Sequence, residues 1–453
     1  MAAAKRSISS RTRKSGKTFD VKFDGRPPGH LKTGMKIRAR GRVQVDSRKH
    51  GRVPGEDGRV ADGELVLAEG NESIQAVSEP PVAQLVAGEK RVIVMVINLL
   101  DAPNTCTPST VHSLVFGSTN SVKGLYNEMS YGALNITGDV IGPLTINYYK
   151  GSCDYNAWAA AADAAAQAAG VNLSQYTNKV YVLPNGAGCS WGGLGTVGGT
   201  VGRTWIATCG RADVYAHELG HNFTMMHSST DPEDDGIGNC EYCDVSDVMG
   251  YGGYGLRTIN APYKDQMGWI PADKILTPTA SGTYQIAPLT ANPANTPYPL
   301  AIKIGKPGTS SWYYFSYRRR LGYDSNLLSS YAEAVNVHRH DGGIVHTYHL
   351  KTLSDGATFT DPTGKISVKQ VSRSADYVTV QVTLAGSPPP TQSAPTVTLS
   401  PASQSGAAGA ALSYSVTVRN QDGAGAAPST FALTPGYPSG WTGSVSPASL
   451  TLH

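Results

Sequence analysis

The stretch from His217 to His227 constrains this chain more than any other, because it sets a helix, a turn and three imidazoles within a short segment. Residues four apart lie on one face of an α-helix, so His217 and His221 direct two imidazoles to the same place, with Glu218 beside them. His227 lies too far along to share that face. The spacing therefore predicts that the helix ends near Phe223 and that the chain turns to bring the third histidine back.

Three nitrogen ligands with an open fourth position are typical of a catalytic zinc site, whereas structural zinc sites are closed by four protein ligands. A bound Zn²⁺ lowers the pKa of its water to about 7 and polarises a carbonyl group. We predict that His217, His221 and His227 bind the metal and that Glu218 is the general base, which takes a proton from water and hands it to a leaving amine. The motif H-E-x-x-H alone also occurs in helices that bind no metal, and the third histidine favours the metal interpretation.

A second motif, D-V-M-G-Y at 247–251, follows the third histidine and places Met249 two residues before Tyr251. With the histidine motif it resembles the metzincin zinc peptidases. The stretches 123–132 and 260–269 resemble the gametolysin-like branch of that clan. The resemblance implies an α+β metzincin-type catalytic domain in a secreted zinc endopeptidase that acts on protein or peptide substrates.

The resemblance also implies roles for single residues. Met249 is expected to pack beneath the three histidines. Tyr251 resembles the tyrosine that some metzincins place near the zinc, as a weak fifth ligand or a donor to the oxyanion, and a packed aromatic side chain is the alternative. The region 192–202 is expected to include the edge strand that binds extended substrate.

One position departs from the metzincin pattern, which has glycine three residues after the second histidine. Thr224 stands there in this chain. Glycine takes a left-handed backbone conformation readily. For other residues that conformation costs on the order of 1–2 kcal/mol. Either the turn is built differently or the strain is tolerated.

The N-terminal segment differs in charge from the rest of the chain. Residues 1–60 carry 17 Lys or Arg against 5 Asp or Glu, although the whole chain has a net charge of only +4. Apolar and polar residues alternate over 35–45, which predicts a half-buried strand, and 64–67 predicts another. We interpret residues 1–88 as a basic, β-rich propeptide that docks on the acidic catalytic domain through complementary charge. A plain β-domain and a nucleic-acid-binding arm are the alternatives, and no nucleic-acid partner is expected.

Patterning divides the rest of the chain into a catalytic domain (89–276), a β-sandwich domain (277–386), a Pro-rich linker (387–395) and a partial Ig-like module (396–453). In the catalytic domain we expect strands at 92–98, 134–144 and 180–183, and helices at 122–130, 157–169 and 213–223, the last capped by Asp213. In the sandwich we expect strands at 283–286, 300–304, 312–317, 343–348, 366–371 and 378–384.

All six cysteines fall between Cys106 and Cys243, inside the expected catalytic domain. An even count in one domain favours disulfides and an oxidising compartment, although the pairing stays open. The pair Cys240-x-x-Cys243 is interpreted as disulfide-bonded rather than zinc-binding. The chain has no apolar run of the roughly 18 residues that a transmembrane helix needs. These features favour secretion without a transmembrane segment.

Several polar clusters have competing interpretations. The acidic loop 231–236 offers oxygen ligands for Ca²⁺, but a solvated loop is favoured. The run 318–320, three arginines, is interpreted as a solvated strand end. A second metal site is weighed and not favoured; it would draw on four histidines, His338, His340, His346 and His349. For the whole chain, the alternative to a peptidase is a non-catalytic extracellular adhesion protein on the same scaffold, against which Glu218 argues.

Overall fold

The computed structural model describes residues 85–236, 240–386, 393–422, 426 and 429–452, together with the backbone of short strands within the first 84 residues. Those strands are β1 (Ser7–Arg11), β2 (Thr18–Lys22), β3 (Ile37–Ala39), β4 (Gly41–Gln44), β5 (Gly63–Leu67) and β6 (Ile74–Ala76). The strands expected over 35–45 and 64–67 are thus present as β3, β4 and β5, while their side chains lie outside the described part. The propeptide role of this segment stays a prediction.

A five-stranded sheet forms the first lobe, with strand order β10-β11-β9-β7-β8. Its strands are β7 (Gly88–Asn98), β8 (Leu134–Thr145), β9 (Asn178–Val182), β10 (Gly193–Gly195) and β11 (Gly202–Ile206). They are parallel except for β10, which pairs antiparallel with β11 at the edge. The helices are α1 (Pro108–Phe116), α2 (Val122–Met129), α3 (Tyr155–Ala168) and α4 (Ala212–Asn222). The mixed α/β pattern expected from the sequence is confirmed, with Asp154 capping α3.

The central strand β7 is buried on both faces because helices cover both sides of the sheet. Successive side chains of a strand point to opposite faces. Val92, Val94 and Val96 therefore pack with α1, α2 and α4 in one core. Ile93, Met95 and Ile97 pack with the alanine-rich face of α3 in another core.

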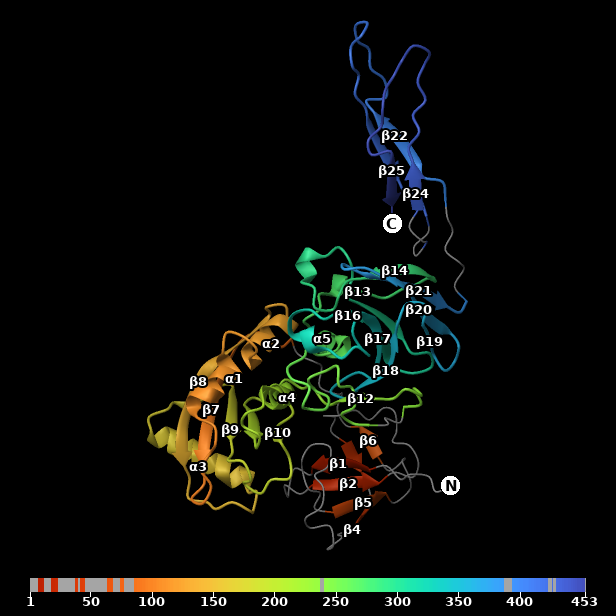
Figure 1. The fold of residues 1–453 in the computed structure, drawn as a ribbon. Coiled ribbons are helices and arrows are strands. Elements are labelled where there is room, and N and C mark those ends of the chain that lie inside the picture. Colours follow the sequence, from red (N-terminus) through yellow and green to blue (C-terminus); the bar gives the residue numbers. More distant parts are fainter. Residues whose placement is uncertain are drawn as a thin grey trace.

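Two packed sheets form the second lobe, which lies beside the first in Figure 1. The six-stranded sheet contains β12 (Ser228–Thr230), β18 (Thr347–Leu353), β17 (Ala334–His340), β16 (Trp312–Arg318), β15 (Ala301–Gly305) and β13 (Ile275–Leu276), in that order. The four-stranded sheet contains β14 (Gly282–Ile286), β21 (Val378–Leu384), β20 (Ile366–Arg373) and β19 (Thr358–Thr360), in that order. Side chains of both sheets share one core, as in a β-sandwich. The sequence missed β17, and its strand at 343–348 is displaced, since β18 begins at Thr347.

The strand β12 connects the two lobes. It begins directly after His227 and pairs in parallel with β18, with Ser228 opposite Thr347. Asn260 strengthens the junction, since its side-chain amide donates to Thr347 Oγ1 at 2.7 Å and caps α5 (Ala261–Gln266) through its carbonyl oxygen. The strand β12 precedes the expected domain boundary at residue 276, yet it belongs to a sheet whose other strands lie at 275–353.

Arg318 is fully buried, so its interpretation as part of a solvated strand end is wrong. Its guanidinium donates to both carboxylate oxygens of Asp324, at 2.8 and 2.9 Å. A further N–H donates to the carbonyl oxygen of Ser246 at 3.0 Å, close to the segment that carries Met249. A planar guanidinium suits such a bidentate, buried pair.

The acidic loop is likewise not solvated at Asp231 and Asp234, which are buried. Both carboxylates accept hydrogen bonds from Arg339 at 2.5 Å, and Lys306 lies 2.6 Å from Asp234. Basic side chains of the second lobe therefore surround these carboxylates, which is the environment of an ion-pair network rather than of a calcium cage.

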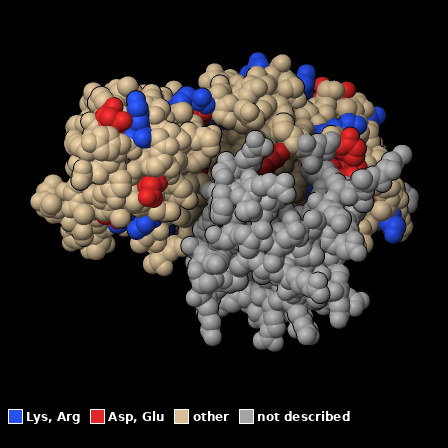
Figure 2. All heavy atoms as spheres, turned by 90° about the horizontal axis from the view of Figure 1, so that it is seen from below, with Lys and Arg blue, Asp and Glu red and all other residues tan. Residues whose placement is uncertain are grey.

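The C-terminal segment forms two antiparallel pairs, β22 (Thr396–Ser400) with β23 (Ser415–Arg419) and β24 (Ser429–Ala432) with β25 (Ser449–Leu452). The assignment of an Ig-like module there stays a prediction. On the face shown in Figure 2, basic and acidic side chains are interspersed over the described surface. Among the described helices, none has the length and apolar content needed to cross a membrane.

Candidate metal centre

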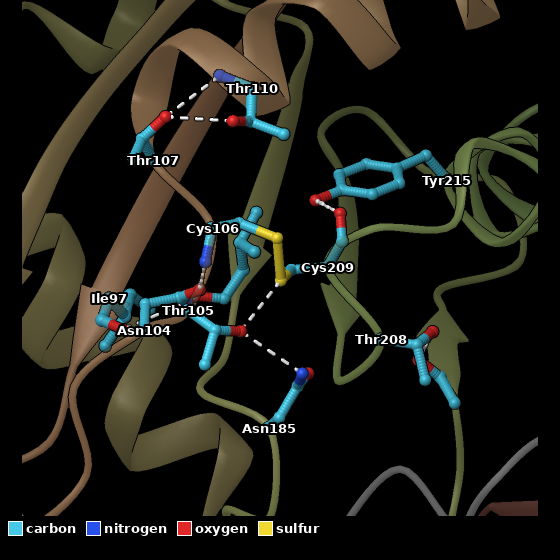
Figure 3. The surroundings of a disulfide bond; sticks show 12 residues. Ile97, Asn104, Thr105, Cys106, Thr107, Thr110, Asn185, Thr208, Cys209 and Tyr215 are labelled. Carbon is cyan, nitrogen blue, oxygen red and sulfur yellow. Dashed lines mark hydrogen bonds between the residues drawn. A yellow bond between two sulfur atoms is a disulfide. The ribbon is translucent and has the colours of Figure 1, made fainter.

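A disulfide and its neighbours fix the entry to α4, the helix that carries the H-E-x-x-H motif. Cys106, in the loop before α1, is bonded to Cys209, three residues before α4 begins. Figure 3 shows Tyr215 of α4 pointing back to this bridge, where its hydroxyl donates to the carbonyl oxygen of Cys209 at 3.0 Å. The start of the helix is therefore tied to the loop before α1, a few residues ahead of the H-E-x-x-H motif. The other cysteines pair as Cys153–Cys189 and Cys240–Cys243, so the disulfide interpretation is confirmed.

The helix begins slightly earlier than the sequence suggests. Arg211 is the N-cap residue and makes no capping side-chain bond, so the expectation that Asp213 caps the helix is wrong. Asp213 lies in the first turn, where a carboxylate is favoured by the helix dipole. It accepts a hydrogen bond from Arg211 Nε at 2.8 Å and another from the backbone N–H of Gly253 at 2.9 Å. The carboxylate thus joins the helix start to the chain beyond Met249.

The helix ends at Asn222 with Phe223 as C-cap, as predicted. Thr224 then takes a φ of 74°, in the left-handed region. The backbone N–H of Thr224 donates to the carbonyl oxygen of His221 at 2.9 Å, and that of Met225 donates to Gly220 at 3.0 Å. These two bonds are those of a Schellman motif, in which glycine is the usual left-handed residue. The turn therefore has the glycine-type conformation, and threonine tolerates the strain.

We expect Thr224→Gly to raise the free energy of unfolding by about 1 kcal/mol, because glycine relieves the left-handed strain while losing more entropy on folding. Thermal unfolding of the metal-free protein measures the effect. Thr224→Ala is the matched control: it removes the β-branch but keeps the Cβ, so it should lie between the two. A Thr224→Gly protein less stable than wild type would contradict this account of the turn.

The turn brings the three histidines together. Their ring centroids lie 4.9 Å (His217–His221), 4.9 Å (His221–His227) and 5.4 Å (His217–His227) apart. One ring nitrogen of each lies within 4.8 Å of those of the other two. Burial is the main cause that lowers the pKa of His217 and His221 to about 3 and that of His227 well below its usual value. All three imidazoles are therefore neutral at neutral pH, as metal binding requires.

The second nitrogen of each ring is already engaged. Nδ1 of His217 lies 2.9 Å from the carbonyl oxygen of Val248, and Nδ1 of His221 lies 2.8 Å from that of Met225. Nδ1 of His227 lies 2.5 Å from Oε1 of Glu241. Each partner is an acceptor, so each Nδ1 carries the proton and each Nε2 keeps its lone pair. Such outer partners orient the histidines of metal sites.

Glu218 lies beside these nitrogens and is buried, with 7% of its surface exposed. Its Oε2 is 4.0 Å from Nε2 of His221. Burial raises the pKa of Glu218 to about 8. Gly193 of the edge strand packs so closely here that a Cβ would come within 2.5 Å of the carboxylate. The glycine therefore lets β10 pass directly over the glutamate.

Met249 is fully buried, and its Sδ lies against Gly220, where a Cβ would come within 2.4 Å of the sulfur. Its N–H donates to Oδ1 of Asp247 at 2.7 Å, which holds the tight turn. Tyr251 is 60% exposed, and its backbone N–H donates to the carbonyl oxygen of Tyr242 at 2.7 Å. The methionine thus packs under the helix between the histidines, whereas the tyrosine stands at the rim.

A cavity of about 820 Å³ opens beside the histidines. One wall is the edge strand and the loop around it, and the opposite wall is α4 with the Met249 turn. Its lining includes Trp191, Gly193, Leu194, Arg211, Asp213, Val214, His217, Glu218, His221, His227, Glu241, Tyr242, Val248, Tyr251 and Arg257. The cavity therefore has the size and the lining of a substrate cleft.

The sequence analysis missed Glu241 and Tyr242, which stand between the two bonded cysteines Cys240 and Cys243. The Tyr242 ring lies 4.0 Å from the His227 ring. His346, from the second lobe, has its ring 5.4 Å from the same imidazole. The sequence feature that could have indicated Glu241 and Tyr242 is the short Cys-x-x-Cys loop soon after the third histidine. His338 instead bonds Asp244 at 3.0 Å, and the described residues do not bring the four C-terminal histidines into one metal group.

The comparisons with known proteins agree with this geometry. Autolysin from Chlamydomonas reinhardtii is 28% identical over 251 residues, which cover 44% of this chain and 38% of that protein. The chain therefore spans less than two fifths of the relative it matches. The family model of gametolysin peptidase M11, a metallopeptidase family, matches residues 91–359, which include the whole histidine motif and most of the second lobe. The chain belongs to the gametolysin peptidase M11 family.

Proposed function

We propose that this metallopeptidase is a secreted zinc endopeptidase in which His217, His221 and His227 hold the ion. The carrying observation is that three neutral imidazoles, of which His221 and His227 are buried, converge while each Nδ1 lies at hydrogen-bond distance from an acceptor. Three imidazole nitrogens suit a borderline-soft ion such as zinc, while calcium prefers oxygen ligands. A zinc ion held there would supply Lewis acidity, which acidifies water and polarises the scissile carbonyl.

The residues of the chain perform the proton transfers. Glu218 takes a proton from the attacking water and later delivers it to the leaving amine. Burial raises the pKa of Glu218, which makes its carboxylate a stronger base toward the proton of the water. Met249 packs below the metal ligands, and Tyr251 at the rim donates a hydrogen bond to the oxyanion of the substrate.

The edge strand β10 aligns the substrate. It ends the five-stranded sheet and borders the cavity, so one side of its backbone has no strand partner in the described sheet. An extended peptide can add there through main-chain hydrogen bonds. Because a peptide that binds along its backbone is cleaved inside its length, this favours protein substrates and endopeptidase action.

Secretion and the N-terminal propeptide belong to the same proposal. All six cysteines are disulfide-bonded, which suits an oxidising compartment. The charge contrast between residues 1–60 and the rest supports docking of residues 1–88 on the catalytic domain as a cover for the cleft. The later segments, 277–386, 387–395 and 396–453, are proposed as a β-sandwich, a linker and an accessory module.

The test is a cleavage profile on a peptide library, measured with and without a chelator. Cleavage should stop when the chelator removes the ion and should return when stoichiometric Zn²⁺ is added back. Ca²⁺ added alone should not restore it, because imidazole nitrogens bind calcium poorly. Cleavage that persists in the zinc-free protein would refute the proposal.

A further inference from the structure

The third histidine differs from the other two in how its outer nitrogen is held. His217 and His221 stand on α4, and their Nδ1 atoms face backbone carbonyls. His227 stands in the chain beyond the helix, and its Nδ1 faces the side chain of Glu241 at 2.5 Å. Backbone carbonyls remain when a side chain is replaced, whereas the carboxylate does not. The hydrogen bond that orients the Nδ1 of His227 therefore depends on one replaceable side chain.

We infer that Glu241 is a positioning residue for the third metal ligand, with its carboxylate fixing the His227 ring and making Nε2 a stronger donor to the ion. This inference rests on the proposed zinc site. A carboxylate that accepts the Nδ1 proton raises the basicity of the other nitrogen, and loss of such a partner typically weakens metal binding 10–100-fold.

The loop that carries Glu241 is held rigidly beside the histidine. The Cys240–Cys243 disulfide closes it, and Cys240 pairs with Thr230 of β12. Oγ of Ser229 donates to the carbonyl oxygen of Glu241 at 2.6 Å. Because β12 begins one residue after His227, the histidine and its carboxylate partner share one hydrogen-bonded frame, and little entropy is lost when they pair.

Tyr242 holds the other side of the ring. Its ring centroid lies 4.0 Å from that of His227, and its carbonyl oxygen accepts the N–H of Tyr251. The short disulfide loop therefore contacts the imidazole of His227 in two ways, through the carboxylate of Glu241 at Nδ1 and through the ring of Tyr242. The hydrogen bond from Tyr251 to Tyr242 also connects this loop to the Met249 turn.

A second metal ion is the competing interpretation, because ligand atoms of His227, Glu241 and His346 also lie within 4.8 Å of one another. Two atoms that bind one tetrahedral zinc at about 2.0–2.1 Å stand roughly 3.3 Å apart. The 2.5 Å between Nδ1 and Oε1 is shorter than the roughly 2.7–2.9 Å of a charge-assisted N–H···O hydrogen bond, so the two atoms are in direct contact and leave no room for an ion between them. The geometry favours positioning.

The test measures zinc affinity of the full chain by competition with a chromogenic chelator. Glu241→Ala should weaken zinc binding 10–100-fold. Glu241→Gln, whose amide oxygen still accepts the Nδ1 proton, should lose clearly less. Glu233→Ala, at an exposed glutamate of the preceding loop, is the matched control and should bind zinc as wild type does. The d–d absorption of the Co²⁺-substituted protein should change in Glu241→Ala and be largely restored in Glu241→Gln.

Thermal unfolding of the metal-free variants separates positioning from a folding defect, since equal melting temperatures with unequal zinc affinities support the inference. If the wild-type protein binds zinc and cleaves peptides, and Glu241→Ala binds zinc with the same affinity, this inference alone is overturned. A wild-type protein that binds no zinc would overturn the proposed function instead. Two zinc ions per chain, with the second lost in His346→Ala, would overturn positioning in favour of a second ion.

Discussion

Glu218→Gln should reduce peptide cleavage by about 10²–10⁴-fold while leaving the zinc content unchanged, because an amide of the same size cannot take a proton from water. The substitution preserves shape at a place where shape is critical, since Gly193 of β10 packs directly against this side chain. Burial raises the pKa of Glu218 to about 8, which means that the fold disfavours its charged form. A neutral amide in its place should therefore not lower the stability of the protein.

The measurement is kcat/KM on a fluorogenic peptide at saturating zinc, with metal content determined on the same sample. Glu241→Gln is a useful comparison, because it makes the same chemical change at another carboxylate of the cleft and should cost far less activity. Cleavage by Glu218→Gln at the wild-type rate would remove Glu218 from the mechanism.

Asp324→Asn should destabilise the fold by about 3–5 kcal/mol, which is the usual cost of leaving a buried charge without its partner. Arg318 and Asp324 are both fully buried and form a bidentate pair. The carboxylate also accepts the backbone N–H and the hydroxyl of Thr258, each at 3.0 Å. Asparagine keeps the size of the side chain but loses the charge, so the guanidinium remains buried and uncompensated.

Thermal unfolding should show a fall in melting temperature on the order of 10 °C. Asp355→Asn is the matched control, because Asp355 pairs with Arg373 at 3.6 Å and both side chains are 44% exposed. Exposed pairs contribute about 0–1 kcal/mol, so that variant should unfold almost as wild type does. Equal effects of the two substitutions would show that the Arg318–Asp324 pair does not stabilise the fold.

The local features of the site were predictable from sequence because helical spacing alone places His217, Glu218 and His221 together. The end of the helix near Phe223 followed from the need to return His227. The left-handed conformation at Thr224 was one of two alternatives, and the structure shows that a β-branched residue takes the place of glycine. Short-range geometry therefore carried most of what the motif could reveal.

The errors came from contacts between different elements of the fold. Arg318 was read as solvated because it opens a run of three arginines at a strand end, yet its side chain turns inward to Asp324. Asp231 and Asp234 were read as solvated because their loop is acidic, yet Arg339 lies between them. Each charge is compensated by a partner from another element, which no local pattern reveals.

Strand β17 was missed for a related reason. Its sequence A-V-N-V-H-R-H mixes polar and apolar residues, but all seven side chains are buried. It lies in the middle of the six-stranded sheet, where polar side chains find partners such as Asp244 for His338. Apolar and polar residues alternate in strands that have one solvent-exposed face, and this pattern is lost where both faces are covered.

The ladder between β12 and β18 makes one mechanical unit of His227, the proposed third zinc ligand, and the second lobe. A force or a ligand that shifts β18 would pull on the chain one residue beyond His227 and would displace this proposed ligand. A chimaera that takes its second lobe from a related protein would then have to take the 228–230 segment together with β18. Thr347 is the first position to substitute when peptide cleavage in this chain is to be altered from a distance. Its hydroxyl oxygen accepts a hydrogen bond from the side chain of Asn260 where the two lobes meet.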